Sequence, residues 1–357
     1  MRLLRSAIAV SSLLALGLTA CSTSTPTTTP MDSASPMDSA SPMDSASPMD
    51  SASPMESTSG EPMGEVTKGD GTKTIYLVSK GFQHRFWQAV KEGAQQAGTE
   101  FNYKVEFVGP DNEQQVTQQL DMLKTALNSK PAAIGFAALD SGAASPVLDQ
   151  IKAANIPIIA FDSGVDSDIP LTTVQTDNRA AAAEAAKHMA ELVGDKGTVG
   201  LVCHDQTSQT GIQRCEGFQE WMKENAPDVK VLDPQYAGEV GLAANTAKAM
   251  IQANPDMVGI YGTNEAAAIG ALQGVTESGK KLTLVGFDSG KAQLDAIGSG
   301  VEAGAITQSP VKMGYETVKA AIMAVDGQEL PKIIDSGFAW YDKTNMEDPD
   351  IKSNLYE

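Results

Sequence analysis

Hydrophobic and polar residues alternate in a regular way along this chain from residue 74 onward. Short runs that are β-rich or continuously apolar, such as Ile156–Phe161 and Leu284–Phe287, are separated by longer stretches with apolar residues at helical spacing. Continuously apolar runs are typical of strands that are buried on both faces of a parallel sheet. Their alternation with helices therefore predicts a doubly wound α/β fold.

The predicted elements form two series. Strands of the first series are expected at Thr74–Val78, Lys104–Val108, Ala132–Ala137, Ile156–Phe161 and near Leu171–Thr176, with helices that end near Thr99 or cover Glu113–Ser129 and Ala143–Ala154. The second series has helices at Asn178–Val193, Gly211–Asn225, Leu242–Ala253, Glu265–Glu277, Lys291–Ser299 and from Val311, and strands at Gly197–Cys203, Val229–Leu232, Met257–Tyr261, Leu282–Phe287 and Ala303–Thr307. About a dozen strands are too many for one small sheet, which predicts two sheets and hence two lobes.

The first twenty residues have the pattern of an export signal. Arg2 and Arg5 precede an apolar run at Ala7–Leu18, which is too short to span a bilayer comfortably, and small residues follow it. Residues 18–21, Leu-Thr-Ala-Cys, are similar to a lipobox. We therefore expect residues 1–20 to be a lipoprotein signal peptide and Cys21 to be lipidated, which places the protein outside the cytoplasm and anchors it to a membrane. An ordinary secretory signal with an incidental cysteine remains the alternative.

Residues 21–71 are rich in proline, serine and aspartate. The unit Pro-Met-Asp-Ser-Ala-Ser starts at Pro30 and recurs at Pro36, Pro42 and Pro48. This composition cannot build a hydrophobic core, and a six-residue period is too short for a solenoid repeat. We expect a disordered tether between the membrane anchor and the folded part.

The folded part is strongly acidic. The chain has a formal net charge of −19, of which −14 falls on residues 72–357. Such a domain is a poor candidate for binding nucleic acid or anionic lipid surfaces. After the signal, the sequence has no further run of eighteen apolar residues that predicts a membrane span.

Polar side chains stand at the ends of most predicted strands. They are Ser79, Asp162, His204, Asn264, Asp288 and Gln308. Open parallel sheets bind ligands beyond the carboxyl ends of their strands, so this set suits a polyhydroxylated ligand. For each residue taken singly, a role as helix cap or turn residue remains open. Residues 81–87 add Phe82, Phe86 and Trp87, although aromatic residues make up only 5% of the chain, and such rings cover the C–H face of sugars.

The order of several motifs resembles that of a known family. The motifs are Phe86-Trp87, Ile156-Pro157 with Phe161-Asp162, Arg214-Cys-Glu-Gly-Phe218, Tyr261-Gly-Thr-Asn264-Glu265, Val285-Gly-Phe-Asp288 and Ala305-Ile-Thr-Gln308. With them, residues 74–335 resemble the ribose-binding-protein branch of the periplasmic binding proteins. Their type I fold, two doubly wound parallel-sheet lobes joined by a three-segment hinge, is shared with LacI-type repressors.

The resemblance implies a ligand site between the lobes. It places His84, Phe86, Trp87, Asp162, Arg214, Asn264, Asp288 and Gln308 at ligand-contacting positions, with Ser79, Gln83, His204 and Glu239 as further candidates. Two positions depart from the family pattern, because His84 replaces an asparagine and Asp162-Ser163 replaces an Asp-Arg pair of many pentose binders. The ligand is therefore expected to be a monosaccharide or polyol; the two departures argue against ribose itself and leave a hexose, another pentose and a polyol equally open.

The resemblance also implies the organisation and partners of the protein. The N-terminal lobe would comprise residues 72–175 and 309–335, and the C-terminal lobe residues 176–308 and 336–357. Hinge crossings are expected near Thr173–Thr176, Gln308–Pro310 and Asp335–Gly337. A monomer without cofactor or metal would bind its solute and pass it to the permease subunits of an ABC importer.

Cys203 and Cys215 flank a segment that faces the expected site. In an oxidising compartment they can form a disulfide, but sequence separation alone does not decide whether they do. With His204 they do not match a zinc-binding spacing.

Other functions fit the sequence less well. We find no nucleophile elbow, phosphate loop or His-rich metal motif of an enzyme. A LacI-type regulator would need a basic helix-turn-helix where this chain has an export signal and an acidic tether. A receptor for a chemotactic or quorum signal and a nucleoside-binding homologue remain alternatives with the same fold.

Overall fold

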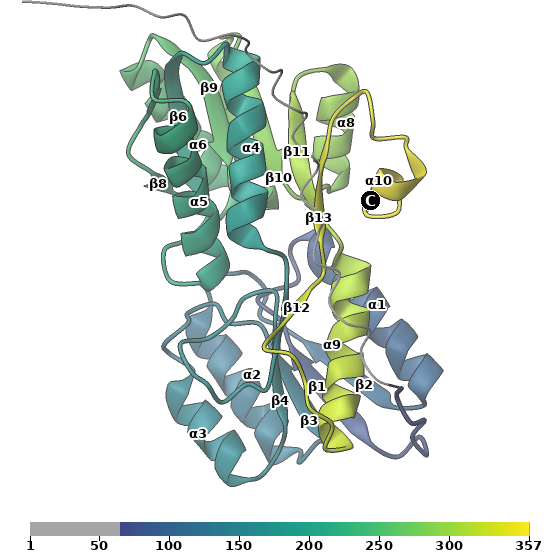
Figure 1. Cartoon of the computed structure of the whole chain (residues 1–357). Coiled ribbons are helices and arrows are strands. Elements are labelled where there is room, and N and C mark those ends of the chain that lie inside the picture. Colours follow the sequence, from purple (N-terminus) through teal and green to yellow (C-terminus); the bar gives the residue numbers. More distant parts are fainter. Residues whose placement is uncertain (1–64, 357) are drawn as a thin grey trace, which may run out of the picture. The chain divides into compact units, whose positions relative to one another are not determined.

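The computed structural model describes residues 65–356 (Figure 1). The predicted signal peptide, the lipidation site at Cys21 and most of the predicted tether lie outside the described residues. In the described part, no helix combines the length and apolar character that crossing a membrane requires.

The first lobe is built on a six-stranded sheet in which all neighbouring strands are parallel. The strand order is β12-β5-β4-β3-β1-β2, with β1 (Thr74–Val78), β2 (Lys104–Val108), β3 (Ala133–Phe136), β4 (Ile158–Phe161), β5 (Thr173–Gln175) and β12 (Ile333–Asp335). Helices α1 (Arg85–Phe101) and α9 (Pro310–Val325) share one core with the sheet, whereas α2 (Val116–Asn128) and α3 (Ser145–Ala153) share another. The sheet is therefore covered on both faces, as its apolar strands predict.

Helices α1 and α9 approach each other at two glycines. A β-carbon added at Gly93 would lie 1.8 Å from the carbonyl oxygen of Val311, and one at Gly314 would lie 1.9 Å from that of Val90. Only glycine allows this approach. The beginning of α1, which carries two cavity residues, is thereby held against α9, which begins just after a crossing between the lobes.

The second lobe contains a seven-stranded sheet. Its order is β13-β11-β10-β9-β6-β7, with β8 paired to β6; the strands are β6 (Gly197–Cys203), β7 (Val229–Val231), β8 (Gln235–Tyr236), β9 (Met257–Gly262), β10 (Thr283–Phe287), β11 (Gly304–Gln308) and β13 (Phe338–Tyr341). The helices are α4 (Asn178–Val193), α5 (Gln209–Asn225), α6 (Val240–Ala253), α7 (Glu265–Ser278), α8 (Lys291–Ser299) and α10 (Pro349–Lys352). Strand β13 is antiparallel to β11, so this sheet is parallel except at one edge.

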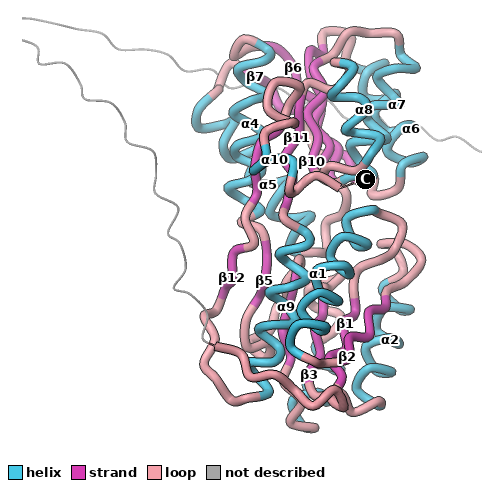
Figure 2. Tube along the Cα trace, turned by 90° about the vertical axis from the view of Figure 1, so that its right-hand side faces the viewer, coloured by secondary structure: helices cyan, strands magenta, loops and turns pink. Residues whose placement is uncertain are grey.

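The chain passes between the two sheets three times, after β5, after β11 and after β12 (Figures 1 and 2). Thr176 links these crossings, because its hydroxyl donates to Gln308 Oε1 at 2.9 Å and lies 3.5 Å from the carbonyl oxygen of Gly337. The three segments thus meet at one buried hydroxyl group. The fold is the predicted one, with two doubly wound lobes.

Some boundaries differ from the prediction. Helix α2 begins at Val116 and not at Glu113, so Glu113 lies in the preceding loop. The end of the predicted tether at residue 71 is too late, because the backbone N–H of Gly69 donates to the carbonyl oxygen of Phe101 and Val66 packs on the first-lobe core. Strands β8, β12 and β13 and helix α10 were not predicted, since each is only two to four residues long.

Residues 336–357 were predicted to belong to the second lobe, and strand β13 is part of the second sheet. Within this segment, the side chain of Tyr356 packs in the core of the first lobe, where it finds apolar neighbours at the start of α1.

Candidate functional site

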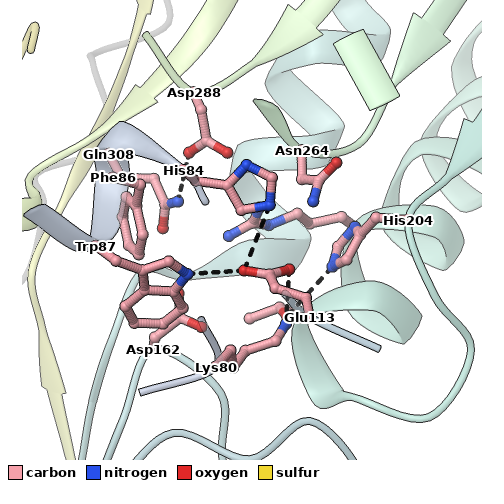
Figure 3. Close-up of a pocket in the computed structure, with 12 residues that line it drawn as sticks. Lys80, His84, Phe86, Trp87, Glu113, Asp162, His204, Asn264, Asp288 and Gln308 are labelled. Carbon is pink, nitrogen blue, oxygen red and sulfur yellow. Dashed lines mark hydrogen bonds and ion pairs between the residues drawn. The ribbon is translucent and has the colours of Figure 1, made fainter. Parts of the chain in front are cut away.

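A cavity lies at the carboxyl ends of the strands, between the two lobes (Figure 3). It is lined by Lys80, His84, Phe86, Trp87, Glu113, Asp162, His204, Thr210, Arg214, Asn264, Asp288 and Gln308. About 280 Å³ of space within this lining is free of protein atoms, and part of that space is open to solvent. The eight residues that the resemblance placed at ligand-contacting positions all line this cavity.

Two aspartates project from the ends of apolar strands. Asp162 follows β4 with a φ of 56°, and Asp288 follows β10 with a φ of 80°. Aspartate tolerates this left-handed region better than most residues with a side chain. The sharp turn at each strand end directs one carboxylate into the cavity from each lobe.

Two aromatic rings form one wall of the cavity. Phe86 and Trp87 lie in the first turn of α1, both are buried, and their ring centroids are 4.9 Å apart in an edge-to-face arrangement. The indole N–H of Trp87 donates to Glu113 Oε1 at 2.7 Å. Both residues are part of the hydrophobic core and both line the cavity.

Arg214 is oriented by three groups of its own lobe. Its Nε donates to Asn178 Oδ1 at 2.7 Å and one terminal nitrogen donates to the carbonyl oxygen of Thr263 at 3.2 Å. The guanidinium also lies over the ring of Phe287, 3.7 Å from the centroid. A planar donor fixed in this way retains further N–H groups for a ligand.

Asp162 contributes a buried carboxylate to the cavity wall. It is 4% exposed, and no hydrogen bond to its carboxylate occurs within residues 65–356. Burial raises the pKa of Asp162 to about 6, although the charges of Lys80 and Arg214 act to lower it. A buried polar group without a hydrogen-bond partner is costly, so the carboxylate of Asp162 is suited to accept a hydrogen bond from a ligand hydroxyl.

Sequence reasoning missed Lys80, which is 2% exposed although it is a lysine. Its Nζ lies 3.1 Å from Thr210 Oγ1 and 3.3 Å from Ser208 Oγ, both in the second lobe, and 4.0 Å from Glu113 in the first. Burial alone lowers the pKa of Lys80, but the charges of Glu113, Asp205 and Asp162 raise it above its usual value. Lys80 is therefore a charged residue that spans the cleft.

Glu113 and Thr210 were missed as well. Glu113 lies in the loop before α2, and its pKa is held below the usual value because Lys80 and His84 outweigh the effect of burial. Thr210 lies in the first turn of α5, where its hydroxyl is 3.4 Å from His204 Nε2. The sequence holds no motif around either residue that points into the cleft.

The four further candidates have different positions. His204 lines the cavity, and burial lowers its pKa to about 3, which keeps the imidazole neutral. Gln83 and Glu239 join the lobes at the rim, where Gln83 Nε2 donates to Glu239 Oε1 at 3.1 Å. Ser79 does not line the cavity, because its buried hydroxyl faces the carbonyl oxygens of Gly81 and Val108.

The disulfide between Cys203 and Cys215 is present. It joins the end of β6 to α5 and so closes the segment that carries Ser208, Thr210 and Arg214. Over residues 65–356, the structure holds no group of three His, Cys, Asp or Glu side chains that is arranged to bind a metal ion.

Comparisons with known proteins identify the family of this chain. Residues 75–329 match the model of a periplasmic binding protein domain. The chain is 26% identical over 264 residues to the ribose import binding protein of Haemophilus influenzae, covering 72% of this chain and 87% of that protein.

Solved structures of solute-binding proteins with bound sugars are similar over about four-fifths of this chain. One is an ABC transporter solute-binding protein from Agrobacterium vitis bound to α-D-tagatopyranose, with 28% identity, a TM-score of 0.77 and coverage of 80% of this chain and 99% of that one. Another is a carbohydrate transporter solute-binding protein from Agrobacterium radiobacter in complex with D-arabinose, with 31% identity, a TM-score of 0.77 and coverage of 79% and 98%. The chain therefore belongs to the periplasmic binding protein family.

Proposed function

We propose that this protein binds one neutral monosaccharide, or a related polyol, in the cavity between its lobes and delivers it to the permease of an ABC importer. The observation that carries the proposal is the convergence of groups from both lobes. The unpaired carboxylate of Asp162 comes from the first lobe, and the oriented guanidinium of Arg214 comes from the second. The protein acts as a carrier and not as an enzyme.

The chemistry of the cavity favours a neutral, polyhydroxylated ligand. The two cations, Lys80 and Arg214, offset two of the three carboxylates of Asp162, Glu113 and Asp288, so the walls carry groups of both signs and do not favour a highly charged ligand. Each hydroxyl group both donates and accepts hydrogen bonds, which suits a wall that carries groups of both kinds. Phe86 and Trp87 offer aromatic surface to the C–H groups of a sugar ring.

We infer a hinge mechanism for binding. The described lobes touch across the cleft, where the backbone N–H of Ser141 donates to the carbonyl oxygen of Thr207 at 3.0 Å. A ligand that bonds to both lobes gains its full set of contacts only when they are together, so it shifts the population toward the closed form. Compaction on adding a tightly bound sugar, measured by small-angle X-ray scattering, is the expected sign of this closure.

Membership of the family implies an extracytoplasmic location. We further propose that the protein is a monomer held at the membrane by lipidated Cys21 and the tether that follows. The substitution Cys21→Ser should release it from membranes, and unchanged membrane association would contradict the anchor.

A thermal-shift screen of the full-length protein tests the proposed ligand class. The panel contains pentoses, hexoses, polyols, nucleosides and amino acids. A ligand at a thousand times its dissociation constant stabilises the protein by about 4 kcal/mol. We expect a clear shift with a neutral sugar that is lost in Asp162→Ala. A response to nucleosides or amino acids alone would overturn the ligand class and leave the fold unaffected.

A further inference from the structure

The segment after helix α10 connects the two lobes beside the cavity. Asn354 is tied to the second lobe, because its carbonyl oxygen accepts a hydrogen bond of 3.0 Å from Thr307 Oγ1. The next residue, Leu355, packs against the second-lobe cluster that includes Tyr341. Tyr356 instead reaches the first lobe, where its ring lies in the core formed by α1, α9 and the sheet.

Tyr356 touches a group on each side of the cavity. Its ring meets the ring of Phe86 edge-on, with 6.3 Å between the centroids. Its hydroxyl accepts a hydrogen bond of 3.3 Å from the backbone N–H of Ser289. Phe86 lines the cavity, and Ser289 directly follows Asp288, which lines it as well. The side chain of Tyr356 thus links Phe86 in the first lobe to Ser289, the residue after Asp288, in the second lobe.

Phe86 has a second contact with the other lobe. His84, the residue before α1, makes no side-chain capping hydrogen bond. The carboxylate of Glu265, at the start of α7, lies close enough to the backbone N–H groups of Phe86 and Arg85 for them to lower its pKa, although burial raises that pKa to about 7. A carboxylate of the second lobe therefore faces the N–H groups at the start of α1, where acceptors are needed.

We propose that Tyr356 is a positioning residue that holds the ring of Phe86 in its cavity-facing orientation while the lobes are together. Separating the lobes must either break the bond from Tyr356 to Ser289 or withdraw the tyrosine ring from the core beside Phe86. A groove lined by Val311, Tyr315 and residues 353–356 lies next to this contact and leaves space for the ring to move. The expected effect on affinity rests on the proposed sugar binding, whereas the effect on Phe86 does not.

Fluorine NMR of the full-length protein, labelled with 4-fluorophenylalanine, tests this role directly. The resonance of Phe86 is assigned by Phe86→Leu. In the absence of sugar, we expect Tyr356→Leu and Tyr356→Phe to shift or broaden that resonance. Tyr315→Phe is the matched control, because it removes a tyrosine hydroxyl that donates to Glu100 at 2.9 Å, also in the first lobe. An unchanged Phe86 resonance in the Tyr356 variants would overturn the proposal, and Tyr356→Phe decides alone if Tyr356→Leu does not fold.

A titration with D-tagatose gives the functional readout. Loss of one hydrogen bond in Tyr356→Phe should raise the dissociation constant about 3–10-fold, with no such change in Tyr315→Phe. Equal affinities of Tyr356→Phe and the unmodified protein would contradict a role in binding. If D-tagatose does not bind the unmodified protein, sugar binding fails for this probe, and the Phe86 resonance still decides the role of Tyr356.

Discussion

Gln308 and Asp288 are bonded to each other in the cavity wall: the side-chain amide of Gln308 donates a hydrogen bond of 2.7 Å to Asp288 Oδ1. Asp288 Oδ2 accepts a second bond, of 2.9 Å, from the backbone N–H of Glu265. Two donors therefore fix the carboxylate before any ligand arrives, and its remaining lone pairs are available to sugar hydroxyls. This pre-orientation lowers the entropic cost of binding.

Replacing Asp288 by asparagine should disturb this arrangement without changing its size. The side-chain amide of asparagine would place its NH₂ group against either the side-chain amide N–H of Gln308 or the backbone N–H of Glu265. Two hydrogen-bond donors would then face each other. We expect the affinity for a bound sugar to fall about 10–100-fold, because hydrogen bonds to a charged acceptor are lost. Calorimetric titration checks this, with the exposed Asp228→Asn as control. Equal affinity in Asp288→Asn and the unmodified protein would argue against a ligand contact.

Sugar binding should weaken in acid. Burial raises the pKa of Asp162 to about 6, so its carboxylate becomes protonated below that pH in the free protein. If sugar hydroxyls donate to the ionised form, affinity falls by up to about tenfold per pH unit below 6 and binding releases a proton there. Titrations at pH 7.5 and pH 5 measure the effect. Asp162→Asn should bind weakly and lose most of this pH dependence, whereas constant affinity of the unmodified protein would contradict the assignment.

Lys80→Met should impair sugar binding, although no sequence motif marks Lys80 as a site residue. The change leaves the charges of Glu113 and Asp205 without their buried cation and removes the bonds to Ser208 and Thr210 across the cleft. We expect an affinity loss of about 10–100-fold. Lys104→Met, at an exposed position at the other end of the same sheet, should bind normally. Normal sugar affinity in Lys80→Met would mean that this lysine serves only the fold.

The disulfide should stabilise the fold. Cys203 and Cys215 are 12 residues apart, and closing a loop of this size contributes about 3 kcal/mol in the chain-entropy account. The double variant Cys203→Ser/Cys215→Ser should therefore unfold at lower urea concentration, and reductant should lower the midpoint of the unmodified protein alone. If reductant lowers the urea midpoint equally in both proteins, the loss of stability does not come from reducing this disulfide.

Glu302 gives a separate dependence of stability on pH. It is 1% exposed, and its Oε2 has no hydrogen-bond partner. Burial raises its pKa from 4.5 to about 8, so between these values the folded state holds a proton that the unfolded state lacks. The stabilising contribution of protonated Glu302 to the free energy of unfolding is therefore fully present below pH 4.5. It falls by up to about 1.4 kcal/mol per pH unit as the pH rises from 4.5 to about 8.

Glu302→Gln should reduce that slope, because glutamine stays neutral. Urea unfolding at pH 5, 6, 7 and 8 measures it. Slopes that do not differ between the variant and the unmodified protein would mean that Glu302 is ionised in the folded state.

Sequence patterns predicted the part of the site that local structure determines. Asp162 and Asp288 stand directly after apolar strands, and in a parallel sheet such positions meet at one edge. Arg214 and the Phe86-Trp87 pair were placed by their order along the chain, which resembles that of a known family. The position of these residues in the cavity could be predicted because the strand and helix boundaries around them were predicted well.

The residues that were missed depend on contacts between distant segments. Lys80 is buried only because Ser208 and Thr210, 128 and 130 positions away, complete its surroundings. Tyr356 is buried because α1 offers it an apolar neighbour in the other lobe. No local spacing distinguishes such residues from an ordinary surface lysine or an aromatic residue in a polar segment.

The most direct test of the account is calorimetric titration of the full-length protein with D-tagatose, D-arabinose, D-ribose and D-allose. The variants Asp162→Ala and Arg214→Met are titrated alongside, because each removes one charged group from a different lobe. We predict one-site binding of at least one of these sugars and a loss of affinity in both variants. Binding that survives both substitutions, or no binding of any neutral monosaccharide, would contradict a sugar site formed jointly by the two lobes.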